Sequence, residues 1–329
     1  MTLMHKKLLL VLILFTLSFP GTSRLVLADG IPLQDRTELI TTPPERAADL
    51  MTTIDEFVRG LSSFDLQSKT LSTGDVTVEQ YLASLRERPQ EWTYEDVEKL
   101  KRVAASITKK LDEAGLTPGF PSTIEVIKTD MKEESGASAY TRLNYIAMGA
   151  DMFNLSDNDF EKVFIHELFH VLSRNNPELQ EKVYNSLGFK KCNEVLYPEQ
   201  IHRISNPDAP FNNYFLTVND DDGAKEVMLI LYADRDYEGG SFFRYAKLGL
   251  MQVNGTANEK VPVLKNNAPV IFQPDDVSDF YEQVGRNTGY IIHPEELSAD
   301  HFVILLNNEA VKDQRIIDDL KKLLIEANQ

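Results

Sequence analysis

The chain has 329 residues, of which 42% are hydrophobic, and it carries a formal net charge of −17. So much negative charge argues against nucleic acid and anionic lipid as partners, because both bind basic surfaces. A single cysteine, Cys192, excludes an internal disulfide, so the stability of the fold must come from packing or from a bound metal.

The first residues predict an export signal. Two lysines precede a mostly apolar run from Leu8 to Phe19, which is too short to span a bilayer. The sequence Val-Leu-Ala at 26–28 offers a small-residue cleavage pattern, and cleavage after Ser23 is an alternative. We therefore expect residues 1–28 to be a signal peptide and the mature protein to be secreted or periplasmic, without a membrane contact. An uncleaved membrane anchor is the other interpretation.

Residues 29–117 predict a helical N-terminal subdomain. Residues 30–45 are polar and indicate a loose leading segment. Apolar residues then recur at helical spacing in three stretches, at 47–61, 77–85 and 94–111. No residue pattern in these stretches indicates a catalytic or binding site.

Two strands and a helix are predicted after the break at Pro118–Pro121. Thr123–Thr129 alternates apolar and polar residues, which indicates a strand, and Asn144–Met148 indicates a second one. Ser156 is placed to cap the following helix, with Asp159 in the capping-box position.

That helix carries the motif with the clearest chemistry. The segment Val163–Leu172 contains His166, Glu167 and His170 in the spacing HExxH. Residues four apart share one helix face, so the two imidazoles can hold one metal ion, and Glu167 can act as a general base toward the attacking water. The other positions are apolar, which predicts a buried helix where unpaired histidines would be costly. A chance match with satisfied core histidines is the alternative.

A third ligand must come from elsewhere, because a catalytic zinc site has three protein ligands. The longer pattern HExxHxxGxxH is absent after His170. Pro294 suits the first turn of a helix, and on that helix Glu296 and Asp300 share one face. Glu296 is the candidate ligand, with Glu295 as the alternative, and Asp300 could fix the tautomer of either histidine.

HELFH followed by an ExxxD helix resembles the gluzincin class of zinc metallopeptidases, which includes thermolysin-like enzymes and anthrax lethal factor. The segment HPEELSADHF also resembles secreted bacterial proteins with HPEE-type helices after HExxH. The resemblance covers about 120–175 and 285–310. The chain departs from the thermolysin pattern in the much longer connection between His170 and Glu296, so substrate specificity does not carry over.

The resemblance implies one Zn²⁺ per chain, bound by His166, His170 and Glu296, with Glu167 as the base. It implies an α+β fold in which residues 118–329 form a zincin-like metallopeptidase domain. An edge strand in such a fold pairs with an extended peptide substrate. From its order in the chain, Asn144–Met148 is the predicted edge strand.

Three further polar residues have open roles. A peptidase of this kind needs a donor for the oxyanion that forms on the attacked carbonyl, and Tyr290 or His293 could supply it. The alternatives are that Tyr290 is half-buried and only packs, and that His293 is an N-cap-like surface residue. Arg142 could position substrate, but a role in holding a strand turn is favoured.

A β-rich insertion is predicted at about 205–275, between the second histidine and the proposed glutamate. The sequence from Asn219 to Gly223 indicates a hairpin turn rather than a calcium loop, since the remaining ligand spacing is missing. An amphipathic helix is expected from Asp313 to Ala327. Cys192 has no nucleophile signature around it and is expected to be structural.

The leading prediction is a secreted zinc metallopeptidase that acts on a peptide or protein substrate. The alternative from another class is a catalytically inert, zinc-stabilised extracellular binding protein on a peptidase fold. Retention of Glu167 favours the first, because a structural zinc site needs no base. A third possibility is a secreted protein with a chance HExxH and no metal.

Overall fold

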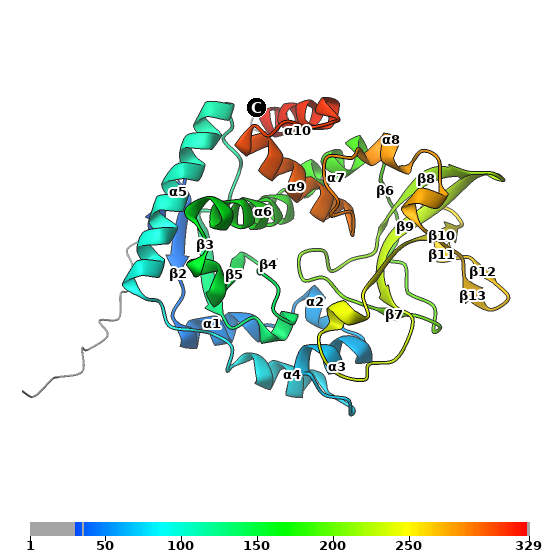
Figure 1. Ribbon diagram of the computed structural model, residues 1–329, viewed down its shortest axis with the longest axis horizontal. Helices are drawn as coiled ribbons and strands as arrows, with labels where there is room; N and C mark the ends of the chain where they lie inside the picture. Colours follow the sequence, from blue (N-terminus) through cyan, green and yellow to red (C-terminus); the bar gives the residue numbers. More distant parts are fainter. Residues whose placement is uncertain (1–29, 35, 328–329) are drawn as a thin grey trace, which may run out of the picture.

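The computed structural model describes residues 30–34 and 36–327, so the predicted signal peptide lies outside the described residues. Within them the fold is mixed α+β, with ten α-helices and two main sheets (Figure 1). None of the described helices has the length and apolar character that crossing a membrane requires.

The first sheet has five strands in the order β1-β2-β3-β5-β4. Their bounds are Ile31–Pro32 for β1, Glu38–Thr41 for β2, Thr123–Thr129 for β3, Tyr145–Gly149 for β5 and Ala139–Arg142 for β4. The three central strands, β2, β3 and β5, run parallel, while β1 and β4 pair antiparallel at the two edges.

The prediction of Asn144–Met148 as the edge strand is wrong. All residues of β5 are buried, and this strand lies between β3 and β4. The edge is β4, a four-residue strand that the sequence pattern did not reveal because its last three residues, Tyr140 to Arg142, are all buried. A strand without alternating exposure lacks the period of two on which strand prediction depends.

Helices cover both faces of this sheet. On one face, Val126, Ile146 and Met148 pack with α5 (Tyr94–Ala114) and α6 (Asp157–Asn175) in the main core. The alternate residues of the same strands face four short helices on the other side. These are α1 (Pro44–Met51), α2 (Glu56–Arg59), α3 (Ser63–Thr70) and α4 (Val78–Leu85).

Elements from both sides of the predicted boundary at residue 117 share one sheet and one core. The stretch expected to be a loose leading segment contains β1 and β2, which join the same sheet as β3. Helix α5 packs in the same core as α6. Its start agrees with the helical pattern, since Thr93 forms a capping box with Asp96.

Helix α6 begins where the sequence predicted. The Ser156 side chain accepts a hydrogen bond from the Asp159 N–H, so it caps the helix. Two further helices, α7 (Pro177–Ser186) and α9 (Pro294–Asn307), pack against α6, and α10 (Gln314–Glu326) packs on α7 and α9. Because α6 packs between the sheet and α9, its buried face meets a second helix (Figure 1).

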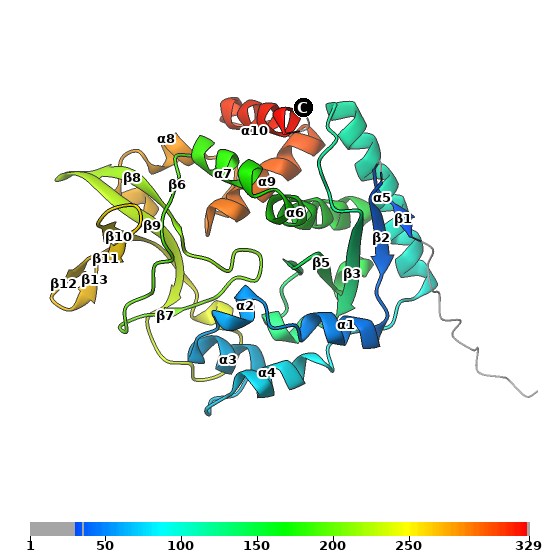
Figure 2. The ribbon, with the colours of Figure 1, turned by 180° about the vertical axis from the view of Figure 1, so that it is seen from behind.

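The second sheet lies in the stretch predicted to be β-rich and is built on β8 (Tyr214–Asp220), β9 (Gly223–Ala233) and β10 (Lys247–Asn254). The predicted hairpin turn joins β8 to β9, and Gly223 there has a φ of 108°. Figure 2 shows this sheet and the first one on opposite sides of the molecule. The smaller elements around it are β6 (Lys190–Lys191), β7 (His202–Arg203), β11 (Val261–Pro262), β12 (Leu264–Lys265), β13 (Ala268–Pro269), β14 (Ile271–Phe272) and α8 (Phe280–Val284).

Arg142 ties the end of β4 to the loop after α1. Its Nε donates to Asp55 at 2.9 Å, and its other nitrogens donate to the carbonyl oxygens of Met51 and Thr53 at 3.0 and 2.9 Å. The side chain is only 2% exposed. Arg142 therefore stabilises the fold on the side of the sheet that the short helices α1 to α4 cover, rather than positioning substrate.

We expect Arg142→Met to lower the free energy of unfolding by about 3–5 kcal/mol, because it leaves Asp55 and two carbonyls without their donor. Urea unfolding followed by circular dichroism measures this loss. The control is Arg59→Gln, which removes an exposed ion pair with Glu56 and should change stability by less than about 1 kcal/mol. Equal effects of the two variants would contradict the structural role of Arg142.

Candidate metal centre

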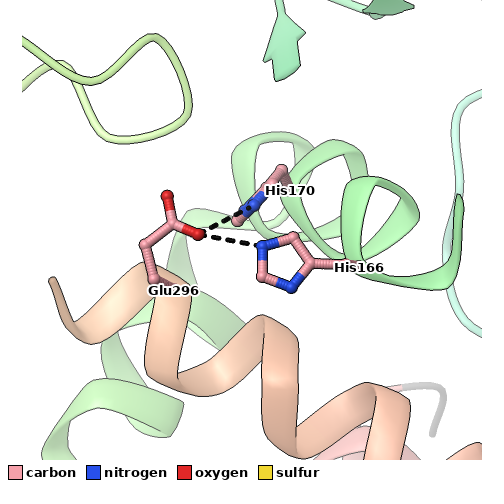
Figure 3. Close-up of side chains that lie close together, drawn as sticks. All are labelled: His166, His170 and Glu296. Carbon is pink, nitrogen blue, oxygen red and sulfur yellow. Dashed lines mark hydrogen bonds and ion pairs between the residues drawn. The ribbon is translucent and has the colours of Figure 1, made fainter. Parts of the chain in front are cut away.

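Helices α6 and α9 bring two histidines and one glutamate together. His166 and His170 lie one turn apart on α6, with ring centroids 4.7 Å apart. Glu296 lies in the first turn of α9, and its Oε2 is 2.9 Å from His166 Nε2 and 3.5 Å from His170 Nε2 (Figure 3). The ligand atoms of these three residues all lie within 4.8 Å of one another.

The outer nitrogen of each histidine is held by a second carboxylate. His166 Nδ1 is 3.0 Å from Asp300 Oδ1, and His170 Nδ1 is 2.9 Å from Glu295 Oε1. A carboxylate on Nδ1 fixes the tautomer and leaves Nε2 for an ion. Both Nε2 atoms therefore face Glu296 as candidate ligands.

Glu295, the alternative third ligand, has a different place. Besides His170, its carboxylate accepts hydrogen bonds from Ser173 Oγ at 2.7 Å and from the Tyr184 hydroxyl. These contacts direct the Glu295 carboxylate away from the two Nε2 atoms and Glu296 Oε2. Glu295 therefore supports the His170 ring and does not join the candidate ligands. The sequence offered no sign of this, because Tyr184 comes from α7.

A test of whether these residues fit a metal comes from His170. The residue is completely buried, and within the described part of the chain its Nε2 has no hydrogen-bond partner. A buried polar atom left unpaired costs free energy, and a metal ion would satisfy it. Two atoms that are each about 2 Å from one ion lie at most about 4 Å apart, and the two pairs in Figure 3 meet this limit. Two imidazoles and one carboxylate are also a ligand set of catalytic zinc.

The carboxylates strongly shift the titration of these groups. Burial opposes charge on His166, but hydrogen bonds to Asp300 and Glu296 outweigh it and raise the pKa of His166 to about 10. Burial also opposes charge on Glu296, but the attraction of His170 and the hydrogen bond from His166 hold its pKa well below the usual value. Without an ion, His166 is therefore protonated at neutral pH.

Glu167 lies beside the three candidate ligands and lines a cleft. It is 4% exposed, its Oε2 accepts a hydrogen bond from Thr141 Oγ1 at 2.8 Å, and burial raises its pKa. A raised pKa brings a carboxylate closer to the range in which a general base works. Thr141 lies on the edge strand β4, so the base is attached to the strand that faces the cleft.

The cleft has a volume of about 690 Å³. Its walls include His166, Glu167, Tyr290 and the chain from Gly136 to Ala139. Tyr290 is 44% exposed, and its ring centroid is 5.8 Å from that of His166. Its hydroxyl thus remains a candidate oxyanion donor.

His293 is engaged elsewhere. Its Nδ1 accepts a hydrogen bond from the Glu295 N–H at 3.1 Å and so caps α9. Burial lowers the pKa of His293 to about 4, and a hydrogen bond joins the ring to the Phe211 backbone. The ring does not line the cleft that contains Glu167. His293 is the N-cap that the sequence offered as the alternative, but it is half-buried rather than on the surface.

Two site residues were missed by sequence reasoning. Asn206 Nδ2 donates to Glu296 Oε1, and Asp208 lies close enough to Glu167 and His170 that ligand atoms of these three are within 4.8 Å of one another. Burial, and then the Glu167 carboxylate, raise the pKa of Asp208 well above its usual value. Both residues lie in the loop between β7 and β8, within the stretch of about 205–275 for which the sequence predicted only a β-rich insertion.

Cys192 is half-buried, and burial raises the pKa of its thiol to about 11. A thiol that stays protonated at neutral pH is a poor nucleophile, which agrees with its expected structural role.

In comparisons with models of protein families, with curated proteins and with solved structures, nothing matches this chain. What the site can do must therefore be derived from its own side chains.

We expect zinc binding to release protons and to strengthen as the pH rises. The metal needs neutral imidazoles, and His166, with its pKa of about 10, is protonated at neutral pH in the metal-free protein. Calorimetry in buffers of different ionisation enthalpy should show at least one proton released per zinc at about pH 7. Asp300→Asn should release fewer protons and bind zinc about 10–100-fold more weakly. An affinity that stays constant from about pH 6 to 9 would contradict His166 as a ligand.

Proposed function

We propose that this chain is a secreted zinc-dependent peptidase, in which His166, His170 and Glu296 hold the metal and Glu167 is the general base. The observation that carries the proposal is the orientation of the two imidazoles. Each has Nδ1 on a carboxylate and Nε2 toward Glu296, and the buried Nε2 of His170 has no hydrogen-bond partner among the described residues. Core histidines that served packing alone would not need this arrangement.

The chemistry divides between the ion and the chain. When bound, zinc polarises the scissile carbonyl and makes a water molecule acidic near neutral pH. Glu167 accepts the proton of the attacking water and delivers it to the leaving amine. Thr141 holds the Glu167 carboxylate through its hydroxyl, which orients the base toward the cleft. Tyr290 is the candidate donor to the oxyanion.

The edge strand supports a peptide as the substrate. In β4 the Thr141 N–H points away from β5, since its partner is Asp208 rather than the sheet. Alternate residues of a strand share one direction, so the backbone of Ala139 faces the same side, where the residue lines the cleft. An extended peptide can add to such an edge by main-chain hydrogen bonds.

The inert zinc-stabilised binding protein remains a second candidate, since Asn206 and Asp208 lie against the ligands and the base. It requires a filled metal site and no turnover. The presence of a buried carboxylate held beside the cleft by Thr141 favours the peptidase, because a structural site has no use for a base.

We expect Glu167→Gln to keep about one zinc per chain and to reduce peptide hydrolysis by about 10²–10⁴-fold, because only the base is lost. Glu296→Ala should lose both zinc and activity, because it removes a ligand. Elemental mass spectrometry and cleavage of a peptide library measure the two properties.

The matched control is Glu178→Gln, an exposed glutamate in the first turn of α7, which should match the wild type in both measurements. Full activity in Glu167→Gln would refute the proposed base. Bound zinc in wild type without any cleavage would favour the inert binding protein.

A further inference from the structure

The open side of the edge strand β4 offers two residues whose backbone groups point away from β5. Thr141 is one of them, because its N–H donates to the Asp208 carboxylate at 2.6 Å. Ala139, two positions earlier, has the same orientation, because the hydrogen-bonding direction alternates along an antiparallel strand. A peptide that adds to β4 by main-chain hydrogen bonds must therefore use these two residues.

Both outward groups of Thr141 are already engaged. Asp208 Oδ1 accepts its N–H, and Arg174 Nη2 donates to its carbonyl oxygen at 3.3 Å. A peptide cannot pair with Thr141 while these contacts are present. The residue of β4 that stays open for pairing is Ala139, so the pairing surface ends before Thr141.

Hydrogen bonds hold Asp208 in this position. It belongs to the connection between β7 and β8, which reaches from the second sheet toward α6 (Figures 1 and 2). Arg174 Nη2 also donates to the carbonyl oxygens of Pro207 and Asp208, at 3.3 and 3.2 Å. The Asp208 N–H donates to Asn206 Oδ1 at 3.0 Å. These bonds keep the Asp208 carboxylate at the end of the pairing surface.

The open cleft lies on the other side of this end. Its walls include Glu167 and the chain from Gly136 to Ala139, whereas Thr141 and Asp208 do not line it. Glu167 accepts a hydrogen bond from the Thr141 hydroxyl, so the base lies where the pairing surface ends. A bound peptide can therefore extend from the base in one direction, along the cleft of about 690 Å³.

A smaller pocket of about 270 Å³, which Asp208 lines, does not continue this path. Among the described residues that line it there is neither Glu167 nor any residue of β4. The path of an extended substrate thus has an open end at Ala139 and a blocked end at Asp208, and a peptidase with one blocked end acts on chain termini.

The blocked end is acidic. Ligand atoms of Glu167, His170 and Asp208 lie within 4.8 Å of one another. Among the described residues, only Oδ1 of Asp208 has a hydrogen-bond donor, which leaves Oδ2 for a further partner. Two carboxylates this close repel each other in a partly buried site unless a positive charge lies between them. The α-ammonium group of a peptide carries such a charge.

An α-carboxylate would not be accepted at the same place. The nearby guanidinium is already engaged with backbone oxygens, since Arg174 Nη1 donates to Leu143 and Nη2 to the carbonyls named above. The two acidic side chains would repel a second negative charge. The chemistry of the blocked end therefore selects an amino terminus.

The spacing limits how much peptide lies before the scissile bond. Ligand atoms of Asp208 and Glu167 are at most 4.8 Å apart, and one extended residue spans about 3.5 Å. Between an ammonium group on Asp208 and a carbonyl attacked beside Glu167 there is room for about one or two residues.

We propose that the chain is an aminopeptidase, in which Asp208 binds the α-ammonium group of the substrate and marks the amino-terminal end of its path. This inference rests on the proposed zinc-dependent peptidase and names its substrates as peptides with a free amino terminus. In each turnover the water oxygen bonds to the carbonyl carbon and the C–N bond breaks. Glu167 passes the proton it took from water to the amine of the shortened peptide.

The test uses the zinc-loaded mature chain and a peptide library in three forms: both ends free, amino ends acetylated, or carboxyl ends amidated. Mass spectrometry over time identifies the bonds that are cut. We expect residues to be removed from the amino end. Acetylation should lower kcat/KM by about 10–100-fold, because it removes a charge-assisted hydrogen bond. Amidation should change kcat/KM by less than about twofold, because the carboxyl end lies in the open cleft.

Asp208→Asn keeps an acceptor for the Thr141 N–H and removes the charge. It should lower kcat/KM for free peptides by about 10–100-fold, mainly through KM, and leave acetylated peptides within about twofold of wild type. Asp279→Asn is the matched control, because Asp279 also accepts a backbone N–H, that of Asn219 at 2.7 Å, but near the second sheet. This control should match the wild type with every form of the library.

Binding without turnover gives an independent readout. In Glu167→Gln, calorimetry should show about 10-fold tighter binding of a free peptide than of its acetylated form. Adding Asp208→Asn should remove this difference. Equal binding of the two forms in Glu167→Gln would contradict Asp208 as the ammonium site.

Equal cleavage of free and acetylated peptides at the same internal bonds would overturn the aminopeptidase and leave the zinc peptidase standing. Removal of residues from the carboxyl end, prevented by amidation, would overturn it in the same way. A zinc-loaded wild type that cleaves no form of the library would refute the proposed peptidase, and the inference with it.

Discussion

The contact between α6 and α9 places charged groups where most proteins keep only apolar ones, and the rest of the site follows from how those groups are satisfied. His170, Glu295 and Glu296 are between 0% and 2% exposed. Buried charges are tolerated only when they are paired and hydrogen-bonded. The two glutamates lie in the first turn of α9, where the helix dipole favours negative charge, and the histidines face them from α6. An ion at the convergence of these groups would complete the pairing.

The carboxylates of the site have the same chemistry, and their surroundings assign them different tasks. Glu296 directs Oε2 to both imidazoles and is placed as a ligand. Glu295 and Asp300 each hold the Nδ1 of one histidine, which fixes the rings. Glu167 is held by a threonine hydroxyl beside the cleft and keeps a raised pKa. Position relative to the imidazoles, rather than residue type, therefore separates ligand, support and base.

Local patterns predicted the parts of this site that lie on single helices. The i, i+4 spacing of His166 and His170 and the proline at the start of α9 are short-range features, and the structure brings the two histidines and Glu296 together. The tertiary partners were not predictable in this way. Which histidine Asp300 supports depends on how α9 crosses α6, and His293 became a cap because its ring turned toward the Glu295 N–H.

For the fold, too, local patterns were predictable and contacts between elements were not. Helices such as α5 and α6 were found from their apolar spacing and caps, and the strand Thr123–Thr129 from its alternation. The edge strand β4 was missed because it is short and buried on both faces, and the N-terminal stretch was taken as separate because β1 and β2 are only two and four residues long. Short strands depend on their neighbours for stability, so their sequences carry little periodic signal.

Rigid and movable parts meet at the metal centre. The proposed ligands from α6 and α9 lie on packed helices, whereas Asn206 and Asp208 come from a connection with little apolar burial of its own, in which only Ser205 and Pro207 are buried. Its ties to the centre are hydrogen bonds rather than packing: Asn206 donates to Glu296, and Asp208 and Pro207 accept from Thr141 and Arg174. Regions with few buried apolar contacts open at lower free energy than the core. A segment held in this way can leave the centre while the helices that carry the histidines stay in place, because those helices are packed in the main core.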